Sequence, residues 1–359
     1  MSCRSVRASG SARGSAGGVV METKSTTRLE DLAKLAGVSI STASRALNDS
    51  PAVNVRTKQK IWKLAREMDY PFRHYMPAGP IGANATISIV VPRPQSREGR
   101  MADPFFFELI AGIGDAARER GCDILLSYIA PSSYEELATA MSTSRSDGVI
   151  FLGQSTLHDA FNRLSEIEDR FVVWGAAFPE QSYCSVGSDN IAGGRRATSH
   201  LARLGREKII FLGDTDAPEA AQRLRGYREG LELSGLQYED RLIVPSHFQV
   251  ASARAVVESL ISEGADFDAI FAASDLIALG AIQAIRRAGR SVPGDVSIVG
   301  YDNVPFGVYA EVPLSTIDQD TGKAGRMLVS KLLDSSGQRG PDQDRIPAEL
   351  IIRSSCGAP

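Results

Sequence analysis

Two different spacings of hydrophobic residues divide the chain. Between residues 28 and 68, apolar positions recur every three to four residues in three short runs. From Ile87 onward, short β-branched runs alternate with longer amphipathic stretches. The first spacing predicts short helices, and the second predicts alternating strands and helices.

The first region predicts a three-helix unit. Thr27 and Glu30 are spaced as a capping box, and Gly37 is a typical residue for ending the helix that follows. Ser39 is the expected cap of a second helix that runs to about Leu47, and Asn54 is the expected cap of a third. A three-residue turn between the first two helices is typical of a helix-turn-helix unit.

The second region predicts an α/β fold with parallel sheets. The expected strands are 87–91, 123–128, 148–152, 171–175, 208–213, 242–245, 269–273 and 297–302. The expected helices include 105–120, 190–204, 217–234, 249–264 and 275–289. Because the pattern restarts near residue 207, we expect two doubly wound lobes, with a ligand cleft at the carboxyl ends of the strands.

Composition places the boundaries between these regions. Residues 1–24 are rich in Ser, Gly and Arg and predict a disordered tail. Residues 71–85, PFRHYMPAGPIGANA, contain three prolines and two glycines and predict a linker. The helix-turn-helix unit is therefore assigned to 25–70 and the two-lobed domain to 86–355.

Charge is distributed unevenly along the chain. The formal net charge is −3, but residues 1–24 carry +3, residues 25–76 carry +4 and residues 77–359 carry −10. A basic amino-terminal region on an acidic body indicates a polyanionic partner for that region alone.

The bulk features favour a cytoplasmic protein. The four cysteines are far apart and form no CxxC pair, which is typical of reduced thiols. The first residues lack the apolar segment of a secretory signal, and no apolar run approaches about 18 residues, the length of a membrane span.

The second predicted helix, within GVSISTASRALN (37–48), has an unusual polar face. It carries Ser, Thr and a single Arg where an ordinary solvated helix carries Glu and Lys. The stretches LEDLAKLAGVSISTASRALND and VNVRTKQKIWKLAREMDY closely resemble the DNA-binding headpiece of the LacI family of bacterial transcription regulators. The later stretches resemble that family's two-lobed core, which is like a periplasmic sugar-binding protein: DPFFFELIAGIGDAARERG, DGVIF, VGSDNIAGG, HLARLG, RLRGY, ASDLIALGA, DVSIVGYDN and PLSTIDQD.

The resemblance implies that the second helix lies in the major groove of DNA. Ile40 and Ser41 then occupy the positions that choose the operator, and Arg45 the position that reads a base edge, where it can pair bidentately with guanine. The implied phosphate contacts are Ser39, Thr42, Ser44 and Asn48, with Thr27 and Arg56 as weaker candidates. The alternative is a solvated helix in a small structural bundle.

The linker departs from the family pattern. Family members follow the headpiece with a hinge helix that wedges an apolar side chain, often Leu, into the minor groove. Here Pro77 and Pro80 oppose a helix and no Leu is present, so Met76 is the nearest apolar substitute. The hinge is either truncated or bends DNA differently.

The resemblance also implies an effector site between the lobes. Arg223 and Asp302 form a charged pair that grips hydroxyls, and the implied supporting residues are Gln319, Asp275, Phe105, Phe106 and Phe248. Three positions depart from sugar-binding members: Gly175, where an acid is sometimes found, Leu152 and Ser274. As alternatives, Arg223 and Asp302 could form an interlobe salt bridge, Phe106 could be a core residue, and Trp174 is more often core than ligand platform.

Enzyme motifs are weak or absent in the sequence. GIGDAA (112–117) matches a dinucleotide fingerprint, but it lies some twenty residues after the nearest strand, so we interpret its glycines as close packing inside a helix. No Walker, GxSxG or HExxH motif occurs, the four histidines are dispersed, and no cofactor or metal is expected. The rivals are a solute-binding receptor without DNA function and a sugar-metabolising enzyme.

The sequence therefore predicts a cytoplasmic transcriptional repressor rather than an enzyme. We expect a homodimer on a palindromic operator, under allosteric control by a small-molecule effector, a sugar or related metabolite. The tail from residue 336 on shows no leucine heptad, which favours a dimer over a tetramer.

Overall fold

The computed structural model describes residues 28–47, 50, 52–68, 85–92, 103–127, 129–143, 146–334 and 342–358. The chain divides into two compact units, residues 1–78 and 79–359. The predicted tail (1–24), most of the predicted linker (71–84), Thr27 and Asn48 lie outside the described residues.

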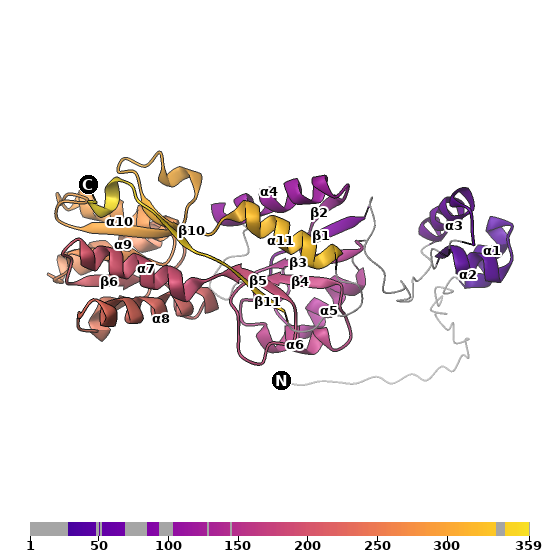
Figure 1. Ribbon diagram of the computed structural model, residues 1–359, viewed down its shortest axis with the longest axis horizontal. Coiled ribbons are helices and arrows are strands. Elements are labelled where there is room, and N and C mark those ends of the chain that lie inside the picture. Colours follow the sequence, from indigo (N-terminus) through magenta and orange to yellow (C-terminus); the bar gives the residue numbers. More distant parts are fainter. Residues whose placement is uncertain are drawn as a thin grey trace, which may run out of the picture. The chain divides into compact units, whose positions relative to one another are not determined.

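The first unit is the expected bundle of three short helices (Figure 1). They are α1 (Leu29–Ala36), α2 (Ile40–Leu47) and α3 (Val55–Glu67). Leu32, Ala46, Ile61 and Ala65 are almost completely buried at the centre of the bundle. The 3.6-residue spacing of the apolar positions therefore places one face of each helix in a shared core.

Local hydrogen bonds explain where these helices begin and end. Gly37 adopts a left-handed conformation (φ 69°) that ends α1, as predicted. The Asn54 side chain accepts from the backbone N–H of Thr57 at 2.8 Å, which confirms it as the cap of α3. The predicted capping box was one residue off: α1 begins after Arg28, whose backbone N–H donates to Asp31 at 3.0 Å.

The second unit contains two six-stranded sheets with equivalent strand orders, β11-β5-β4-β3-β1-β2 and β12-β10-β9-β8-β6-β7. Within these sheets only the pairing of β10 with β12 is antiparallel among the described strands. The α/β fold of two doubly wound lobes is thereby confirmed, and each sheet forms the centre of one lobe.

The first lobe combines two distant parts of the chain. Its strands are β1 (Thr86–Val90), β2 (Asp123–Ser127), β3 (Gly148–Leu152), β4 (Phe171–Trp174), β5 (Ser185–Ser188) and β11 (Gln343–Ile346). Its helices are α4 (Pro104–Glu119), α5 (Tyr134–Thr143), α6 (His158–Ser165) and α11 (Thr321–Leu333).

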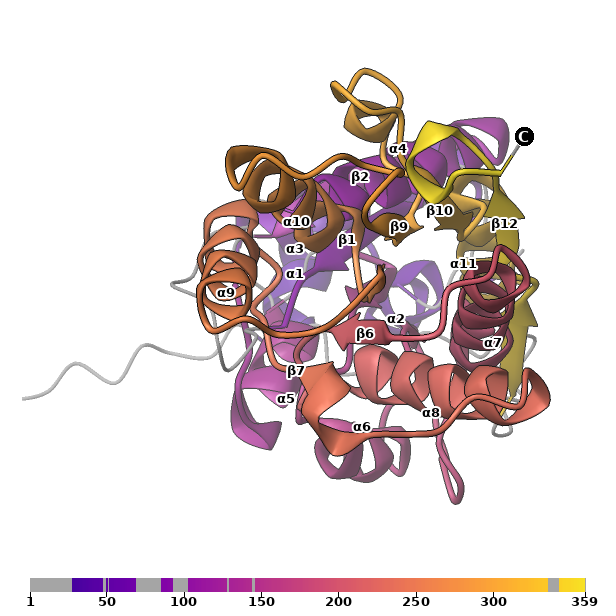
Figure 2. The ribbon, with the colours of Figure 1, turned by 90° about the vertical axis from the view of Figure 1, so that its left-hand side faces the viewer.

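The second lobe lies between those two parts of the sequence. Its strands are β6 (Ile209–Leu212), β7 (Ile243–Val244), β8 (Ala269–Ala272), β9 (Ser297–Asp302), β10 (Ser315–Asp318) and β12 (Glu349–Ile351). Its helices are α7 (Asn190–Arg203), α8 (Pro218–Leu233), α9 (Val250–Ser262) and α10 (Asp275–Arg287), with short 3-10 turns at Asp240–Leu242, Pro305–Gly307 and Ser354–Cys356. Figure 2 shows α7 and α8 on one side of this sheet and α9 and α10 on the other.

The chain passes between the lobes three times: from β5 to α7, from β10 to α11 and from β11 to β12. The sequence pattern predicted one restart near residue 207 and did not reveal the return of α11 and β11 to the first lobe. Figure 1 shows the yellow carboxy-terminal strand running from one lobe to the other.

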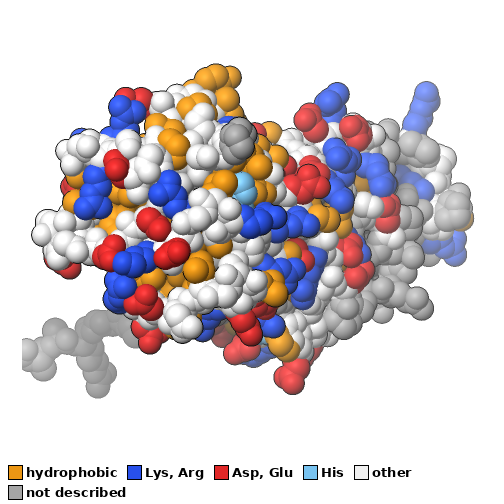
Figure 3. All heavy atoms as spheres, turned by 60° about the vertical axis from the view of Figure 1, so that its left-hand side comes forward, with side chains coloured by type: hydrophobic (Ala, Val, Ile, Leu, Met, Phe, Trp, Pro, Cys, Tyr) orange, Lys and Arg blue, Asp and Glu red, His pale blue; other side chains and the backbone are white. Residues whose placement is uncertain are grey.

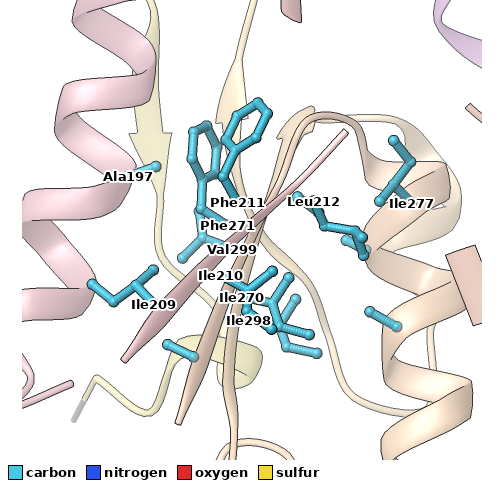
Figure 4. Packing of buried hydrophobic residues seen from close by; sticks show 14 of the residues in the cluster. Ala197, Ile209, Ile210, Phe211, Leu212, Ile270, Phe271, Ile277, Ile298 and Val299 are labelled. Carbon is cyan, nitrogen blue, oxygen red and sulfur yellow. The ribbon is translucent and has the colours of Figure 1, made fainter. Parts of the chain in front are cut away.

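Hydrophobic strands form the core of the second lobe (Figure 4). Phe211 and Phe271 on neighbouring strands meet edge to face with ring centroids 5.6 Å apart. Full burial of such a side chain stabilises the fold by about 1.5–3 kcal/mol. The continuous apolar runs seen in the sequence are thus strands covered on both faces.

The GIGDAA stretch lies inside α4, where that helix packs against α11. A Cβ atom at Gly112 would overlap the backbone oxygen of Thr321 and lie 3.0 Å from its carbonyl carbon. Gly112 therefore permits close approach of two helices, as expected, whereas a Cβ atom at Gly114 would be in ordinary contact with Ile124 of β2. The stretch does not follow a strand as a dinucleotide fingerprint must.

Candidate functional site

The outer face of α2 exposes the residues predicted to read DNA. Ile40 is 49% exposed, and Ser41 and Arg45 are also exposed. Ala43 and Ala46 on the opposite face are buried in the three-helix core. The helix thus presents one large apolar side chain, one guanidinium and several hydroxyls outward.

Hydroxyl groups cluster at the start of α2. The Ser39 oxygen accepts from the backbone N–H of Thr42 at 3.1 Å and lies 2.8 Å from the Thr42 hydroxyl and 2.9 Å from that of Ser41. Ser39 is therefore the cap predicted from the sequence. Ser44 is half-buried one turn further on, and Arg56 is exposed in the first turn of α3.

In the second unit, Arg223 is the centre of a buried polar cluster. Its guanidinium donates to Asn190 Oδ1 at 2.9 Å and to the carbonyl of Ala273 at 2.5 Å, and it stacks over the ring of Tyr301 at 3.7 Å. The Asp302 carboxylate lies 3.8 Å from Nη1. Because Arg223 is on α8 and Asp302 ends β9, the pair lies within the second lobe and is not the interlobe salt bridge considered above.

Asp302 is held in a strained position. Its φ is 119°, a region that side-chain-bearing residues rarely adopt, and only 7% of the residue is exposed. Gln319, at the crossover after β10, donates to its carboxylate at 2.6 Å. Burial raises the pKa of Asp302 well above its usual value, because Arg223 and Gln319 offset only part of the desolvation and Asp275 and Asp103 add repulsion.

Asp275, the first residue of α10, is completely buried near Asp302. Its two carboxylate oxygens accept from the Thr316 hydroxyl at 2.6 Å and from the backbone N–H of Val304 at 2.9 Å. Burial raises its pKa to about 7. These bonds tie the segment after Asp302 to α10, so both of these hydrogen bonds of Asp275 are formed within its own lobe.

The predicted aromatic residues differ in their surroundings. Phe105 is 7% exposed and lies 5.8 Å from Phe106 and 5.9 Å from Trp174, measured between ring centroids. Trp174 is buried in the first-lobe core, in agreement with its core interpretation, and Phe106 packs partly against the same core. Phe248 is half-buried against the core of the second lobe.

Several polar residues of this region were missed by the sequence reasoning. Asn190 is 2% exposed and orients Arg223, and the Tyr301 hydroxyl lies 3.1 Å from that of Ser188 on β5 of the other lobe. Gln222 on α8 donates to the carbonyl of Ala177 in the first lobe at 2.8 Å. Asn190 and Ser188 occur in VGSDN and Tyr301 in GYDN, so the motifs contained them without revealing their roles.

The residues that the structure describes contain neither a metal-binding cluster nor a membrane-spanning helix. No group of His, Cys, Asp and Glu among them is arranged to hold a metal ion. Within the same ranges, every helix is too short or too polar to cross a membrane.

Comparison with known proteins covers both units. Residues 28–71 match the bacterial regulatory proteins of the lacI family, and residues 198–356 match the periplasmic binding protein-like domain. The HTH-type transcriptional regulator CelR of Thermobifida fusca is 31% identical over 93% of this chain and all of its own length. The HTH-type transcriptional repressor CytR of Escherichia coli K12 is 31% identical over 92% of this chain and 96% of its own.

Solved structures give the same result. A complex of the transcriptional regulator CelR with cellobiose is 30% identical and matches 92% of this chain and 99% of its own, with a TM-score of 0.65. These relatives are regulators, which confirms the prediction that the chain is not an enzyme. The similarity to CelR extends over nearly the whole length of both chains. This chain therefore belongs to the LacI family of bacterial regulatory proteins.

Proposed function

We propose that this chain is a cytoplasmic transcriptional repressor that binds operator DNA as a homodimer. A sugar or related metabolite, bound at the buried polar cluster around Arg223 and Asp302, controls its affinity for the operator. The observation that carries this proposal is the outer face of α2, where Ile40, Ser41 and Arg45 are exposed on a helix-turn-helix unit.

The DNA contacts follow from the chemistry of this face. The Arg45 guanidinium can donate two parallel hydrogen bonds to guanine O6 and N7, whereas the short side chains of Ser41 and Thr42 let the helix backbone approach the groove. Ser39, Thr42, Ser44 and Asn48 are proposed phosphate contacts, with Thr27 and Arg56 as weaker candidates. The net charge of +4 over residues 25–76 favours binding to a polyanion.

The effector site follows from the buried polar groups. Arg223 and Asp302 supply a charged donor and a charged acceptor in one small region, and Gln319 and Asp275 lie beside them. Phe105 and Phe106 supply aromatic surface in the first lobe, and Phe248 does so in the second. Such a combination suits the hydroxyls and C–H faces of a sugar. The cellobiose bound by the relative CelR supports this class of ligand.

Exposed apolar residues support the homodimer. Phe306, Val308 and Tyr309, in the segment after β9, are 62%, 44% and 86% exposed, and Phe107 on α4 is 51% exposed. Figure 3 shows hydrophobic side chains gathered along the upper edge of the face it presents. Exposed apolar clusters of this kind are typical of protein interfaces.

The test is selection of bound DNA from a random duplex pool by the purified protein at physiological salt. Recovery of a palindrome two half-sites long would support a sequence-specific dimer, and release of that DNA by one of a panel of sugars would support effector control. Recovery of no sequence above background, together with sugar binding, would favour the alternative function of a solute-binding module.

A further inference from the structure

Helix α7 carries an arginine-rich outer face in the second lobe. Arg195, Arg196 and Arg203 lie on this helix, which contains no Asp or Glu, although residues 77–359 carry a net charge of −10. The opposite face of α7, with Leu201, is buried in the core of the lobe. Figure 2 shows α7 between α8 and the strand β12. A basic surface therefore lies on an otherwise acidic domain.

Two hollows of about 470 Å³ each open beside this face, and Arg196 and Arg203 line both of them. A volume of this size is within the range of small-molecule sites. The first hollow also contains Glu349 and Leu350 of β12, and its carboxylate opposes an anion. The second hollow contains no carboxylate and is the candidate site. Its remaining lining residues are Arg195, Ser199, Ala202, Leu233 and Ser234.

The three guanidinium groups differ in how they are paired. Arg195 donates to the carboxylate of Glu229 on α8 at 3.0 Å, and Arg196 donates to the backbone carbonyl of Ala348. Arg203 is exposed and forms no hydrogen bond or ion pair with a described residue. Because only Arg195 of the three has a carboxylate partner within the described ranges, the hollow keeps an excess of positive charge.

The helix dipole explains only part of this arrangement. Arg203 lies in the last turn of α7, where the partial negative charge of the helix end favours a cation. Arg196 lies about two turns earlier, and the influence of the dipole is confined to the end of the helix. The dipole therefore does not account for a second arginine on the same face.

The spacing of the polar side chains suits two linked phosphate groups. Arg196, Ser199 and Arg203 recur at intervals of three and four residues, so they share one face of α7. The first and last are about 10 Å apart along the helix axis, farther than a single phosphate extends. A guanidinium donates two parallel hydrogen bonds to a phosphate. The Ser199 hydroxyl, which lies between them, has no hydrogen-bond partner among the described residues and is free to donate.

We propose that the hollow beside α7 and the end of α8 binds the diphosphate group of a small soluble molecule. Arg196 and Arg203 each hold one phosphate, and Ser199 donates between them. Leu233, which is 74% exposed at the same hollow, offers apolar surface for an uncharged part of the ligand, such as a nucleoside. The site shares no residue with the cluster around Arg223, and the inference does not depend on the proposed sugar effector.

The test is calorimetric titration of the full-length protein with ADP, inorganic pyrophosphate, inorganic phosphate and adenosine. We expect ADP and pyrophosphate to bind about tenfold more tightly than phosphate or adenosine, because only they carry linked phosphates. Tighter binding of ADP than of pyrophosphate would identify a nucleoside diphosphate as the ligand, and equal binding would identify free pyrophosphate chemistry. If neither binds at about 1 mM, or if adenosine binds as tightly as ADP, the proposal is overturned.

Arg203→Gln locates the binding, with Arg287→Gln as the matched control. Arg287 is also exposed in the last turn of a helix of the second lobe, α10, on the other side of the sheet. Both variants remove one positive charge from the same kind of position. We expect Arg203→Gln to weaken pyrophosphate binding about tenfold and Arg287→Gln to change it by less than about twofold.

Equal losses in the two variants would indicate general attraction of an anion to the protein and would overturn the proposal. Unchanged binding by Arg203→Gln would place the ligand elsewhere and would overturn it as well. Arg203 has no partner to lose among the described residues, so thermal unfolding without ligand should be the same for the variant and the unaltered protein. Arg203→Lys, which keeps the charge but not the paired donors, should recover only part of the affinity.

Discussion

The outer face of α2 and the cluster around Arg223 use similar side chains in opposite surroundings. On α2, Arg45 and Ser41 are exposed to solvent and Arg45 is the only charged residue of the helix. Around Arg223, the guanidinium and Asp302 are both at least 93% buried, and hydrogen bonds or stacking link them to Asn190, Tyr301 and Gln319. We expect substitutions on the exposed face of α2 to have nearly additive effects. Substitutions in the buried cluster around Arg223 should instead have strongly coupled effects.

Breaking the buried unit should have the largest effect. Asp302→Ala leaves the Arg223 guanidinium buried without its carboxylate, so we expect loss of the sugar response and a core destabilised by about 3 kcal/mol or more. Operator binding without sugar should persist. Sugar titration, thermal unfolding and gel-shift measurements test these three expectations.

Asp302→Asn is the matched control for this variant. It keeps the side-chain volume and an oxygen for Gln319, so it should lose the sugar response with a smaller loss of stability. A normal sugar response in both variants would remove Asp302 from the effector site.

The stability of the buried cluster should depend on pH. The pKa of Asp275 is raised to about 7 in the folded protein, above its ordinary value near 4, so between these values the folded state binds more protons than the unfolded state. The free energy of unfolding of the core should therefore fall as pH rises from about 4 to 7, by up to roughly 1.4 kcal/mol per pH unit for this group.

Asp275→Asn tests the source of this slope, because it removes the titrating group and keeps an acceptor for Val304. Denaturant unfolding at several pH values should show a flatter profile for the variant. An unchanged profile would assign the slope to another group, with Asp302 as the next candidate because its pKa is raised as well.

A single substitution on α2 should act on DNA binding alone. Arg45→Ala should weaken binding to the preferred operator by about 1–3 kcal/mol and relax the base preference at one position. Arg56→Ala is the control, since loss of a phosphate contact should weaken all sequences alike. Equal binding of the preferred site by Arg45→Ala and the unaltered protein would contradict the assignment of α2.

The smallest effect is expected at the cap of α2. Ser39→Ala removes the side-chain acceptor of the Thr42 N–H, which should destabilise the three-helix unit by about 1 kcal/mol. Sugar binding by the core should not change. The shift would be measured as loss of operator binding by the full-length protein with rising temperature, compared between Ser39→Ala and the unaltered protein.

The sequence predicted most elements because their signals are local. The run SIVGYD matches β9 at both ends, and the predicted helix 190–204 differs from α7 by one residue. In contrast, β5 (Ser185–Ser188) and β11 (Gln343–Ile346) were missed, because SVGS and QDRI are short and largely polar, and they become strands by pairing with each other across more than 150 residues of chain.

The sequence located only part of the buried polar cluster. Motifs located Arg223 and Asp302 because each lies in a word shared with the family. The contact between Gln154 and Gly175 was missed, because the Gln154 amide fills the volume that a side chain at Gly175 would occupy, twenty-one positions away in sequence. No local pattern reports that two such positions share one volume.

The three passages of the chain between the lobes have a consequence for synthesis on the ribosome. The three-helix unit is complete once Glu67 has been made, whereas the first lobe lacks α11 and β11, and the second lacks β12, until nearly the whole chain exists. A message cut short after residue 320 would therefore encode a complete helix-turn-helix unit joined to two unfinished lobes. Ribosomes that stall late would release a DNA-binding fragment with no means of sensing a sugar.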